Sequence, residues 1–228
     1  MTLLPLNKFA RYFDHAALYP EVDEPAIEKV CCEAIENGFY SVAINPVWVS
    51  SARSYLMGTP VKILSVAGFP LSASRTDIKV AEAAKGVADG AHEIDMVVNI
   101  GWLVSDRFSD AEHEIAEVRK CLPHNVLLKV IIEAGKLTKL QQQQATKTVI
   151  NGGAQFVKTC TGFFGGATTD QVKTLVNAAD GQIEVKASGG IRTLKQCREL
   201  IEAGASRLGS SSSVSILGEL TQKNQSQD

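Results

Sequence analysis

The chain has 228 residues, and its composition and charge already exclude several classes of protein. Its 23 basic and 25 acidic residues nearly cancel, so the basic excess typical of a nucleic-acid groove or a polybasic membrane face is missing. No apolar stretch approaches the length of a membrane span, and residues 1–10 lack the features of a signal peptide. The five cysteines are odd in number and form no Cys-x-x-Cys motif, which argues against a disulfide framework or a zinc knuckle. We therefore expect a cytoplasmic domain without a nucleic-acid or membrane partner.

Short β-branched runs alternate along the chain with longer amphipathic stretches. Several helical stretches end at a glycine just before the next strand, as at Gly38, Gly90 and Gly204, where the chain often needs a positive φ. Eight such units predict an α/β fold, a single-domain (β/α)8 TIM barrel over residues 1–220, followed by a polar, disordered tail over residues 221–228. A doubly wound open sheet is the alternative fold. The expected strands are Phe13–His15, Tyr40–Asn45, Val61–Gly68, Glu93–Asn99, Leu127–Glu133, Gln155–Cys160, Ile183–Ser188 and Arg207–Gly209, and the expected helices lie near 24–37, 48–57, 75–89, 108–121, 138–151, 168–179, 193–203 and 213–220.

Charged side chains collect on one face of these expected strands. Side chains alternate across a strand with period two, and in a barrel one face points inward. Lysines and carboxylates are rarely buried unless paired, so the cluster indicates either a structural ion-pair network or an active site. Active sites of such barrels lie at the C-terminal ends of the strands, where Asp95, Lys158 and Lys186 fall, whereas Lys129 lies deeper and suits a supporting role. The inward set is Asp95, Asn99, Lys129, Glu133, Lys158, Glu184 and Lys186.

Two lysines on neighbouring strands favour a specific chemistry. A lysine amine is a nucleophile only when neutral, and burial or a second ammonium group lowers its pKa to about 7–8. The neutral amine condenses with a carbonyl to form a Schiff base. The protonated iminium then accepts electrons from a breaking carbon–carbon bond, and a nearby carboxylate can move the protons. Lys158, Lys186 and Asp95 therefore predict Schiff-base chemistry.

Two glycine- and serine-rich loops indicate a phosphate site. Ser188-Gly189-Gly190-Ile191-Arg192 follows the seventh expected strand and opens a helix, and Gly209-Ser210-Ser211-Ser212 follows the eighth. Loops in these two positions frequently bind phosphate through backbone N–H groups. Each motif alone also suits an ordinary turn, but their joint placement favours phosphate binding.

At these positions the chain resembles the deoxyribose-phosphate aldolases, a family of class I aldolases. The resemblance extends from about Phe13 to Leu217. The segments that carry it are Asp14-His15, Asn45-Pro46, Gly68-Phe69-Pro70-Leu71, Glu93-Ile94-Asp95-Met96-Val97-Val98-Asn99, Leu128-Lys129-Val130-Ile131-Ile132-Glu133, Phe156-Val157-Lys158-Thr159-Cys160-Thr161-Gly162-Phe163 and Val185-Lys186-Ala187-Ser188-Gly189-Gly190-Ile191-Arg192-Thr193.

The resemblance implies a reaction and a role for each residue. Lys158 is expected to form the Schiff base, Lys186 to lower the pKa of Lys158 and help move protons, and Asp95 to act as the acid/base carboxylate. Asp14 and Lys129 are expected to support them. The implied reaction is reversible cleavage of 2-deoxy-D-ribose 5-phosphate to glyceraldehyde 3-phosphate and acetaldehyde in deoxyribose catabolism, by a monomer or homodimer with no metal or organic cofactor. The residues expected around the phosphate are Gly162, Gly189, Gly190, Arg192, Gly209, Ser211 and Ser212.

The chain departs from the family pattern at a few positions. The family often has threonine and lysine where Ala16 and Tyr19 stand, cysteine where Ala43 stands, and serine where Cys160 stands, and its loop after Lys158 is longer. These departures bear on substrate fit and leave the Schiff-base residues in place. Two alternatives therefore stay open: an aldolase of the same fold acting on another aldehyde pair, and a non-catalytic barrel that binds sugar phosphates.

Overall fold

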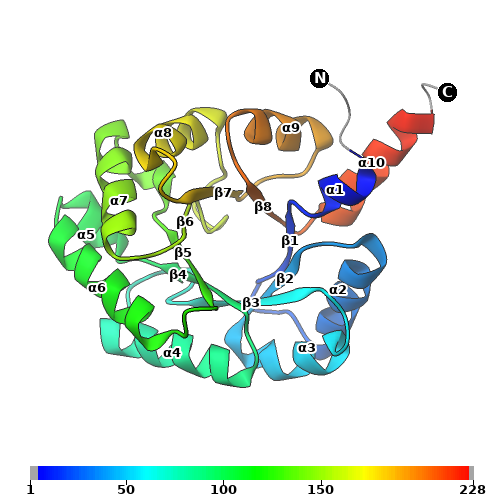
Figure 1. The fold of residues 1–228 in the computed structure, drawn as a ribbon, viewed down its shortest axis with the longest axis horizontal. Coiled ribbons are helices and arrows are strands. Elements are labelled where there is room, and N and C mark those ends of the chain that lie inside the picture. The colour runs from blue at the N-terminus through cyan, green and yellow to red at the C-terminus, as the bar shows by residue number, and fades with distance from the viewer. Residues whose placement is uncertain (1–4, 226–228) are drawn as a thin grey trace.

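Eight parallel strands close into a barrel in the computed structural model, which describes residues 5–225 (Figure 1). Each strand pairs with the next along the chain, and β8 pairs with β1. This order confirms the predicted (β/α)8 barrel and excludes the open sheet, which would have two unpaired edges and a reversal of strand order. The strands are β1 (Phe13–Ala17), β2 (Ser41–Ile44), β3 (Lys62–Ala67), β4 (Glu93–Val97), β5 (Leu127–Ile131), β6 (Phe156–Lys158), β7 (Glu184–Ser188) and β8 (Arg207–Ser210).

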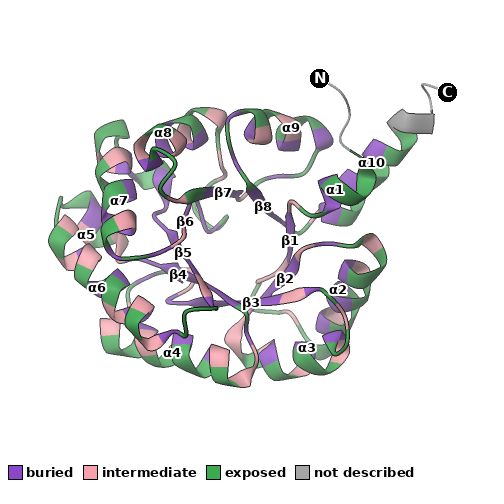
Figure 2. Cartoon of the chain, in the orientation of Figure 1, coloured by how far each residue is buried: buried purple, intermediate pink, exposed green. Residues whose placement is uncertain are grey.

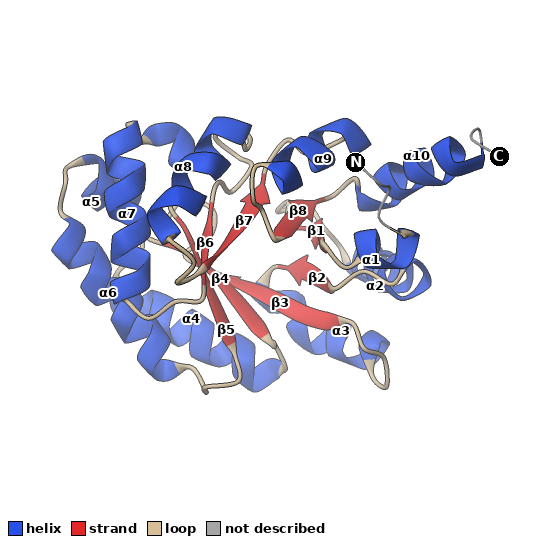
Figure 3. Cartoon of the chain, turned by 45° about the horizontal axis from the view of Figure 1, so that its top comes forward, coloured by secondary structure: helices blue, strands red, loops and turns tan. Residues whose placement is uncertain are grey.

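Helices surround the barrel on its outer side (Figures 1 and 3). The predicted helices are all present, and two further helices of five residues each, α1 and α5, were not predicted. Helix α10 includes residues 221–225 of the expected tail, and residues 226–228 lie outside the described part of the chain. The helices are α1 (Leu6–Ala10), α2 (Glu24–Asn37), α3 (Val49–Leu56), α4 (Thr76–Asp89), α5 (Ile100–Val104), α6 (Phe108–Cys121), α7 (Lys139–Asn151), α8 (Thr169–Ala179), α9 (Leu194–Glu202) and α10 (Ser213–Gln225), with 3-10 turns η1 (Pro46–Trp48) and η2 (Ala134–Lys136).

The main apolar core lies between the strands and the helices. Ile94 and Met96 of β4 and Leu128 and Val130 of β5 are fully buried there, on the outward faces that period-two alternation predicts. The barrel strands are buried throughout most of their length, while the outer helix faces are exposed (Figure 2). Among residues 5–225, no helix is long and apolar enough to cross a bilayer.

Three helices that follow site-bearing strands start with the same local device. Helices α7, α8 and α9 each begin with a capping box. In each box a threonine side chain accepts from the backbone N–H of the glutamine three residues later, and the side chain of that glutamine accepts from the backbone N–H of the threonine. The box satisfies backbone N–H groups that a helix start leaves without partners. These helix starts therefore fix where the loops after β5, β6 and β7 end.

Candidate active site

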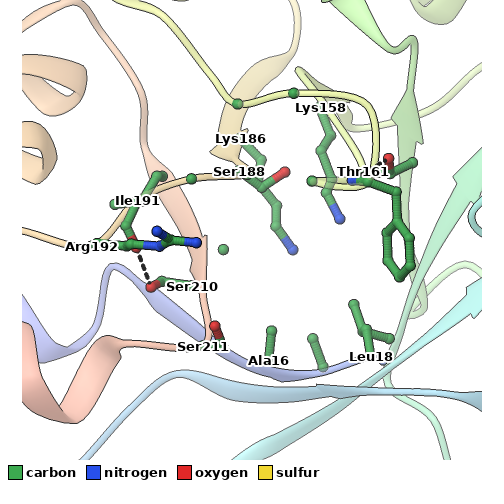
Figure 4. A pocket seen from close by; sticks show the side chains of 18 of the residues that line it. Ala16, Leu18, Lys158, Thr161, Lys186, Ser188, Ile191, Arg192, Ser210 and Ser211 are labelled. Atoms are coloured by element: carbon green, nitrogen blue, oxygen red, sulfur yellow. Dashed lines mark hydrogen bonds between the residues drawn. The ribbon is translucent and has the colours of Figure 1, made fainter. Parts of the chain in front are cut away.

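A cavity of about 370 Å³ opens at the C-terminal ends of the strands, where the sequence places the reactive residues (Figure 4). Lys158 and Lys186 point into it, and Arg192 reaches in from the loop after β7. Ala16 and Leu18 lie on the opposite side. The cavity thus has the two amines on one side and an apolar wall, Ala16 and Leu18, facing them, and Ser211 of the loop after β8 lies beside Ala16 (Figure 4). Its wall also includes Ser188 and Ser210 of the two predicted phosphate loops, and four residues that were not predicted as site residues: Tyr19, Ala43, Thr161 and Phe163.

Asp95 bridges the two lysines directly. Its Oδ2 atom lies 2.7 Å from Nζ of Lys158 and 2.8 Å from Nζ of Lys186. The register of the sheet produces this contact, because Lys158 of β6 stands beside Lys186 of β7. All three side chains are almost completely buried. The predicted catalytic residues are therefore in mutual contact at the base of the cavity.

The surroundings of Lys158 favour its neutral, nucleophilic form. Burial is the largest cause that lowers the pKa of Lys158 to about 8, and the Lys186 ammonium adds to it while Asp95 opposes it. At pH 7 roughly a tenth of the Lys158 side chains are then neutral amines. Burial raises the pKa of Asp95, but the ammonium groups of Lys158, Lys186 and Lys129 outweigh it and hold the pKa well below its usual range. Asp95 is thus an ionised proton acceptor.

Below the cavity the barrel interior holds more charge. The structure brings the two expected supporting residues to this cluster: Asp14 lies 2.5 Å from Lys186, and Lys129 lies 3.3 Å from Oδ1 of Asp95. Arg207 and Glu93 join them; strand alternation places Glu93 on the same inward face as Asp95, but neither residue was predicted as a site residue. Strand alternation could have predicted Arg207, because it lies two residues before Gly209 in β8 and so on the same face of the strand, and Gly209 lines the cavity.

Three residues of the predicted inward set lie elsewhere. The Asn99 side chain accepts from the backbone N–H of Trp102 and caps α5. The Glu133 backbone turns to a left-handed conformation at φ 48°, and its carboxylate accepts from both N–H and O–H of Thr161. Glu184 is exposed at the start of β7. These three positions follow the strand period, but each falls at a strand end, where the chain turns away from the barrel interior.

The loops after β6 and β7 form the polar side of the cavity. Gly189 has φ of 91°, and a Cβ atom there would lie 2.8 Å from the carbonyl oxygen of Gly165. Ser188 ties the two loops together, since its N–H donates to Oγ1 of Thr159 and its Oγ donates to the carbonyl of Cys160. Of the residues expected around a phosphate, Gly162, Gly189, Gly190, Arg192, Gly209 and Ser211 line the cavity. Ser212 is not among its lining residues, and its N–H donates to Oγ of Ser210.

Replacing Gly189 with alanine is expected to damage the polar loops without touching the lysines. The methyl group would meet the backbone of Gly162 and Gly165, and alanine is disfavoured at positive φ. We expect a loss of about 1–3 kcal/mol in the free energy of unfolding and at least a tenfold rise in KM for a phosphorylated substrate. Urea titration and steady-state kinetics measure both, with Gly181→Ala as the control, because Gly181 also has positive φ but has open space around it. Equal KM changes in the two variants would contradict the role of the Gly189 loop.

A (β/α)8 barrel with a buried lysine pair at the C-terminal ends of its strands is the arrangement expected of a carbon–carbon lyase of the aldolase class. Comparisons with known proteins agree: the profile described as DeoC/LacD family aldolase matches residues 9–218. The chain therefore belongs to the DeoC/LacD family of aldolases.

Individual relatives support this assignment over nearly the whole chain. A deoxyribose-phosphate aldolase from Thermococcus kodakarensis is 45% identical over 215 residues, which is 92% of this chain and 96% of that protein. The solved structure of the aldolase QR15 is 37% identical, covers 99% of this chain and 100% of its own, and superposes with a TM-score of 0.91. The deoxyribose phosphate aldolase of Aeropyrum pernix, described as tetrameric, is 28% identical with a TM-score of 0.89, covering 95% of this chain and 92% of that one.

Proposed function

We propose that the chain cleaves 2-deoxy-D-ribose 5-phosphate reversibly to glyceraldehyde 3-phosphate and acetaldehyde, with Lys158 as the Schiff-base residue. The observation that carries this proposal is the contact of one carboxylate oxygen of Asp95 with both Lys158 and Lys186, beside a cavity with glycine-rich loops. A barrel that only bound sugar phosphates would gain nothing from burying a lysine whose pKa is lowered to about 8.

The first half of the reaction uses the neutral amine of Lys158. It attacks the C1 aldehyde of the open-chain sugar, the carbinolamine takes up one proton from solvent, and loss of water leaves a protonated imine at C1. Asp95, ionised and held next to both amines, accepts the proton of the C3 hydroxyl through Lys186 or a water molecule. The C2–C3 bond then breaks, its electron pair moves toward the iminium nitrogen, and glyceraldehyde 3-phosphate departs as the aldehyde.

The second half returns the enzyme to its starting state. The enamine that remains on Lys158 takes a proton at C2, for which the Asp95–Lys186 pair is the adjacent source. Water then adds to the resulting two-carbon imine, and acetaldehyde leaves the amine. One proton is thus taken from the C3 hydroxyl in the first half and one is given to C2 in the second half. A single carboxylate and a single ammonium group therefore suffice for both halves.

Borohydride trapping with acetaldehyde tests the proposed function. Reduction converts the imine to a stable secondary amine, and peptide mass mapping locates the two-carbon adduct. We expect the adduct on Lys158. An adduct on another lysine would overturn the role assignment, and a folded protein without any adduct would favour a barrel that only binds its ligand.

Arg192 is expected to contribute to binding of the phosphate rather than to bond cleavage. It reaches into the cavity from the loop that carries Gly189 and Gly190 and is exposed, whereas the two lysines are buried (Figure 4). Replacing it with alanine should raise KM for 2-deoxyribose 5-phosphate about ten- to a hundredfold with little change in kcat. Unphosphorylated 2-deoxyribose is the matched control substrate, and an equal effect on both sugars would refute the assignment.

The apolar wall supports a second candidate, an aldolase of this fold that acts on other aldehyde pairs. Ala16, Leu18 and Ala43 line the cavity and offer no hydroxyl or thiol to a substrate. Rates with a panel of donor and acceptor aldehydes distinguish the candidates. A higher kcat/KM for an unphosphorylated acceptor than for glyceraldehyde 3-phosphate would favour the second one.

Two wider expectations belong to the same proposal. We expect a cytoplasmic enzyme, because the five cysteines of the chain are free thiols and suit a reducing compartment. We also expect a monomer or homodimer, and light scattering of the purified protein measures this directly. A tetramer, as described for the Aeropyrum pernix relative, would contradict that expectation.

A further inference from the structure

Six charged side chains form a closed ring inside the barrel, below the cavity. Carboxylates and cations alternate around it, and each member lies within ion-pair distance of its two neighbours in the ring. All six are at least 94% buried. In order around the ring they are Asp14, Lys186, Asp95, Lys129, Glu93 and Arg207.

Arg207 and Glu93 close the side of the ring that faces away from the cavity. Nη1 of Arg207 lies 2.8 Å from Asp14 and 3.6 Å from Glu93, and Glu93 contacts Lys129 in turn. The guanidinium carbon of Arg207 also lies 3.5 Å from the centre of the Tyr40 ring, so the planar cation is stacked in place. Neither Arg207 nor Glu93 lines the cavity, and neither can contact a substrate there.

The ring is neutral, and Lys158 is an additional cation that contacts one of its members, Asp95. Each cation of the ring lies between two carboxylates, whereas Lys158 has only Asp95. Among the described residues, the cluster thus holds four cations and three carboxylates when every lysine is protonated. A net charge in a buried site is costly, and the loss of one proton removes it. Arginine does not lose its proton in proteins, so the proton leaves the cation with the fewest carboxylate neighbours, which is Lys158.

We propose that Arg207 and Glu93 are positioning residues of the aldolase reaction: they complete a neutral ring of six charges and so leave Lys158 as the single uncompensated cation, which becomes the free amine. This inference rests on the proposed role of Lys158. The charged groups that contact or neighbour Lys158 are Asp95 from β4 and Lys186 from β7, and these link it to Lys129 from β5, Asp14 from β1 and Arg207 from β8. Strand β2 presents the uncharged Ser41, whose hydroxyl donates to Oδ1 of Asp14, and the barrel interior near β2 and β3 also holds the apolar side chains of Ala43, Leu64 and Val66.

The ring makes the two substitutions act in opposite directions. Removing the positive charge in Arg207→Met leaves the ring negative, so Lys158 keeps its proton to a higher pH. Removing the negative charge in Glu93→Gln leaves the ring positive, so Lys158 loses its proton at a lower pH. The double variant restores neutrality. A merely structural pair would instead lower activity in both variants without shifting the pH profile.

The test is the pH dependence of kcat/KM for unphosphorylated 2-deoxy-D-ribose, a substrate with no group that titrates in the range. The acid limb reports the Lys158 amine in the free enzyme, with a wild-type midpoint near pH 8. We expect the midpoint to rise by about 0.5–1 pH unit in Arg207→Met and to fall by a similar amount in Glu93→Gln. At a fixed pH below the midpoint, kcat/KM should therefore fall about three- to tenfold in Arg207→Met and rise by a similar factor in Glu93→Gln. Arg207→Lys and the double variant should return it to the wild-type value.

A second buried ion pair provides the control. Lys79 lies 2.9 Å from Glu114 on the helix side of the barrel, outside the ring. Lys79→Met combined with Glu114→Gln should lower stability and leave the midpoint in place. Midpoints that stay fixed, or that move the same way in Arg207→Met and Glu93→Gln, would overturn the inference while borohydride trapping on Lys158 still upholds the proposed function. If Arg207→Met does not fold, Glu93→Gln and Arg207→Lys carry the test. Absence of the wild-type adduct would overturn both.

Discussion

Replacing Lys158 with methionine is expected to lower kcat for 2-deoxyribose 5-phosphate by at least about 10⁴-fold, because no other amine can take its place at the cavity. Lys186 is the nearest candidate, but Asp14 and Asp95 hold its ammonium group at 2.5 and 2.8 Å. The fold should survive, since removing Lys158 leaves a neutral ring of charges with all six members paired. We therefore expect a free energy of unfolding at least equal to that of the wild type.

Stopped assays with high enzyme concentrations measure the residual rate, and urea titration measures the stability. Lys195→Met is the matched control, because Lys195 is an exposed lysine on α9 that lies 3.8 Å from Glu199. That variant should keep wild-type activity. Appreciable turnover by a folded Lys158→Met protein would rule out the Schiff-base mechanism at this residue.

Lys186→Met is expected to lower kcat/KM at pH 7 by about 10³-fold, through two separate effects. The first is the loss of a proton carrier between Asp95 and the substrate, which is worth about 10²–10⁴-fold in other enzymes. The second is electrostatic: Lys186 is one of the causes that lower the pKa of Lys158, after burial. Without it the pKa rises above about 8, and each unit of rise removes about nine-tenths of the reactive amine at pH 7.

The direction of the pH effect separates these two contributions. Because the amine must be neutral, activity rises with pH through the pKa of Lys158, and the acid limb of Lys186→Met should lie at higher pH than in the wild type. Raising the pH then recovers the electrostatic part of the loss but not the proton-transfer part. Lys186→Arg keeps the charge and serves as the comparison if the methionine variant is unstable. An acid limb at the wild-type position would remove Lys186 from the role of lowering the Lys158 pKa.

Hydrophobic periodicity was sufficient to predict the barrel. The eight strands carry β-branched runs, and the glycine after helices such as α2 and α4 marks each return to the sheet, so the element order follows from local signals. Helices α1 and α5 were not predicted because five residues span little more than one turn, too few for a period to emerge.

The site could be predicted only in part, and the missing part has a physical cause. Strand parity identified Lys158, Lys186 and Asp95 because each lies well inside or at the end of a recognisable strand. Arg207 begins a strand of only four residues, Arg-Leu-Gly-Ser, whose other inward position is a glycine, so the alternation that could identify Arg207 is weak. Glu133 has the right parity, but its left-handed φ of 48° turns the carboxylate to Thr161. Parity cannot report such a turn, because it assumes that the strand continues.

The connection between β7 and its loop bears on the length of molecule that the cavity can accept. Lys186, which stands beside Lys158 in the sheet, and Gly189 are three residues apart, about 10 Å along an extended chain. The N–H of Ser188 donates to Oγ1 of Thr159, the residue after Lys158, so this segment is held against the neighbouring strand. On the proposed roles of Lys158 and the Gly189 loop, we expect a sugar phosphate with one carbon more or fewer to place its carbonyl at Lys158 or its phosphate at the glycines, but not both. Since a misplacement of about 1 Å can cost about a hundredfold in rate, we expect the enzyme to select its substrates by chain length.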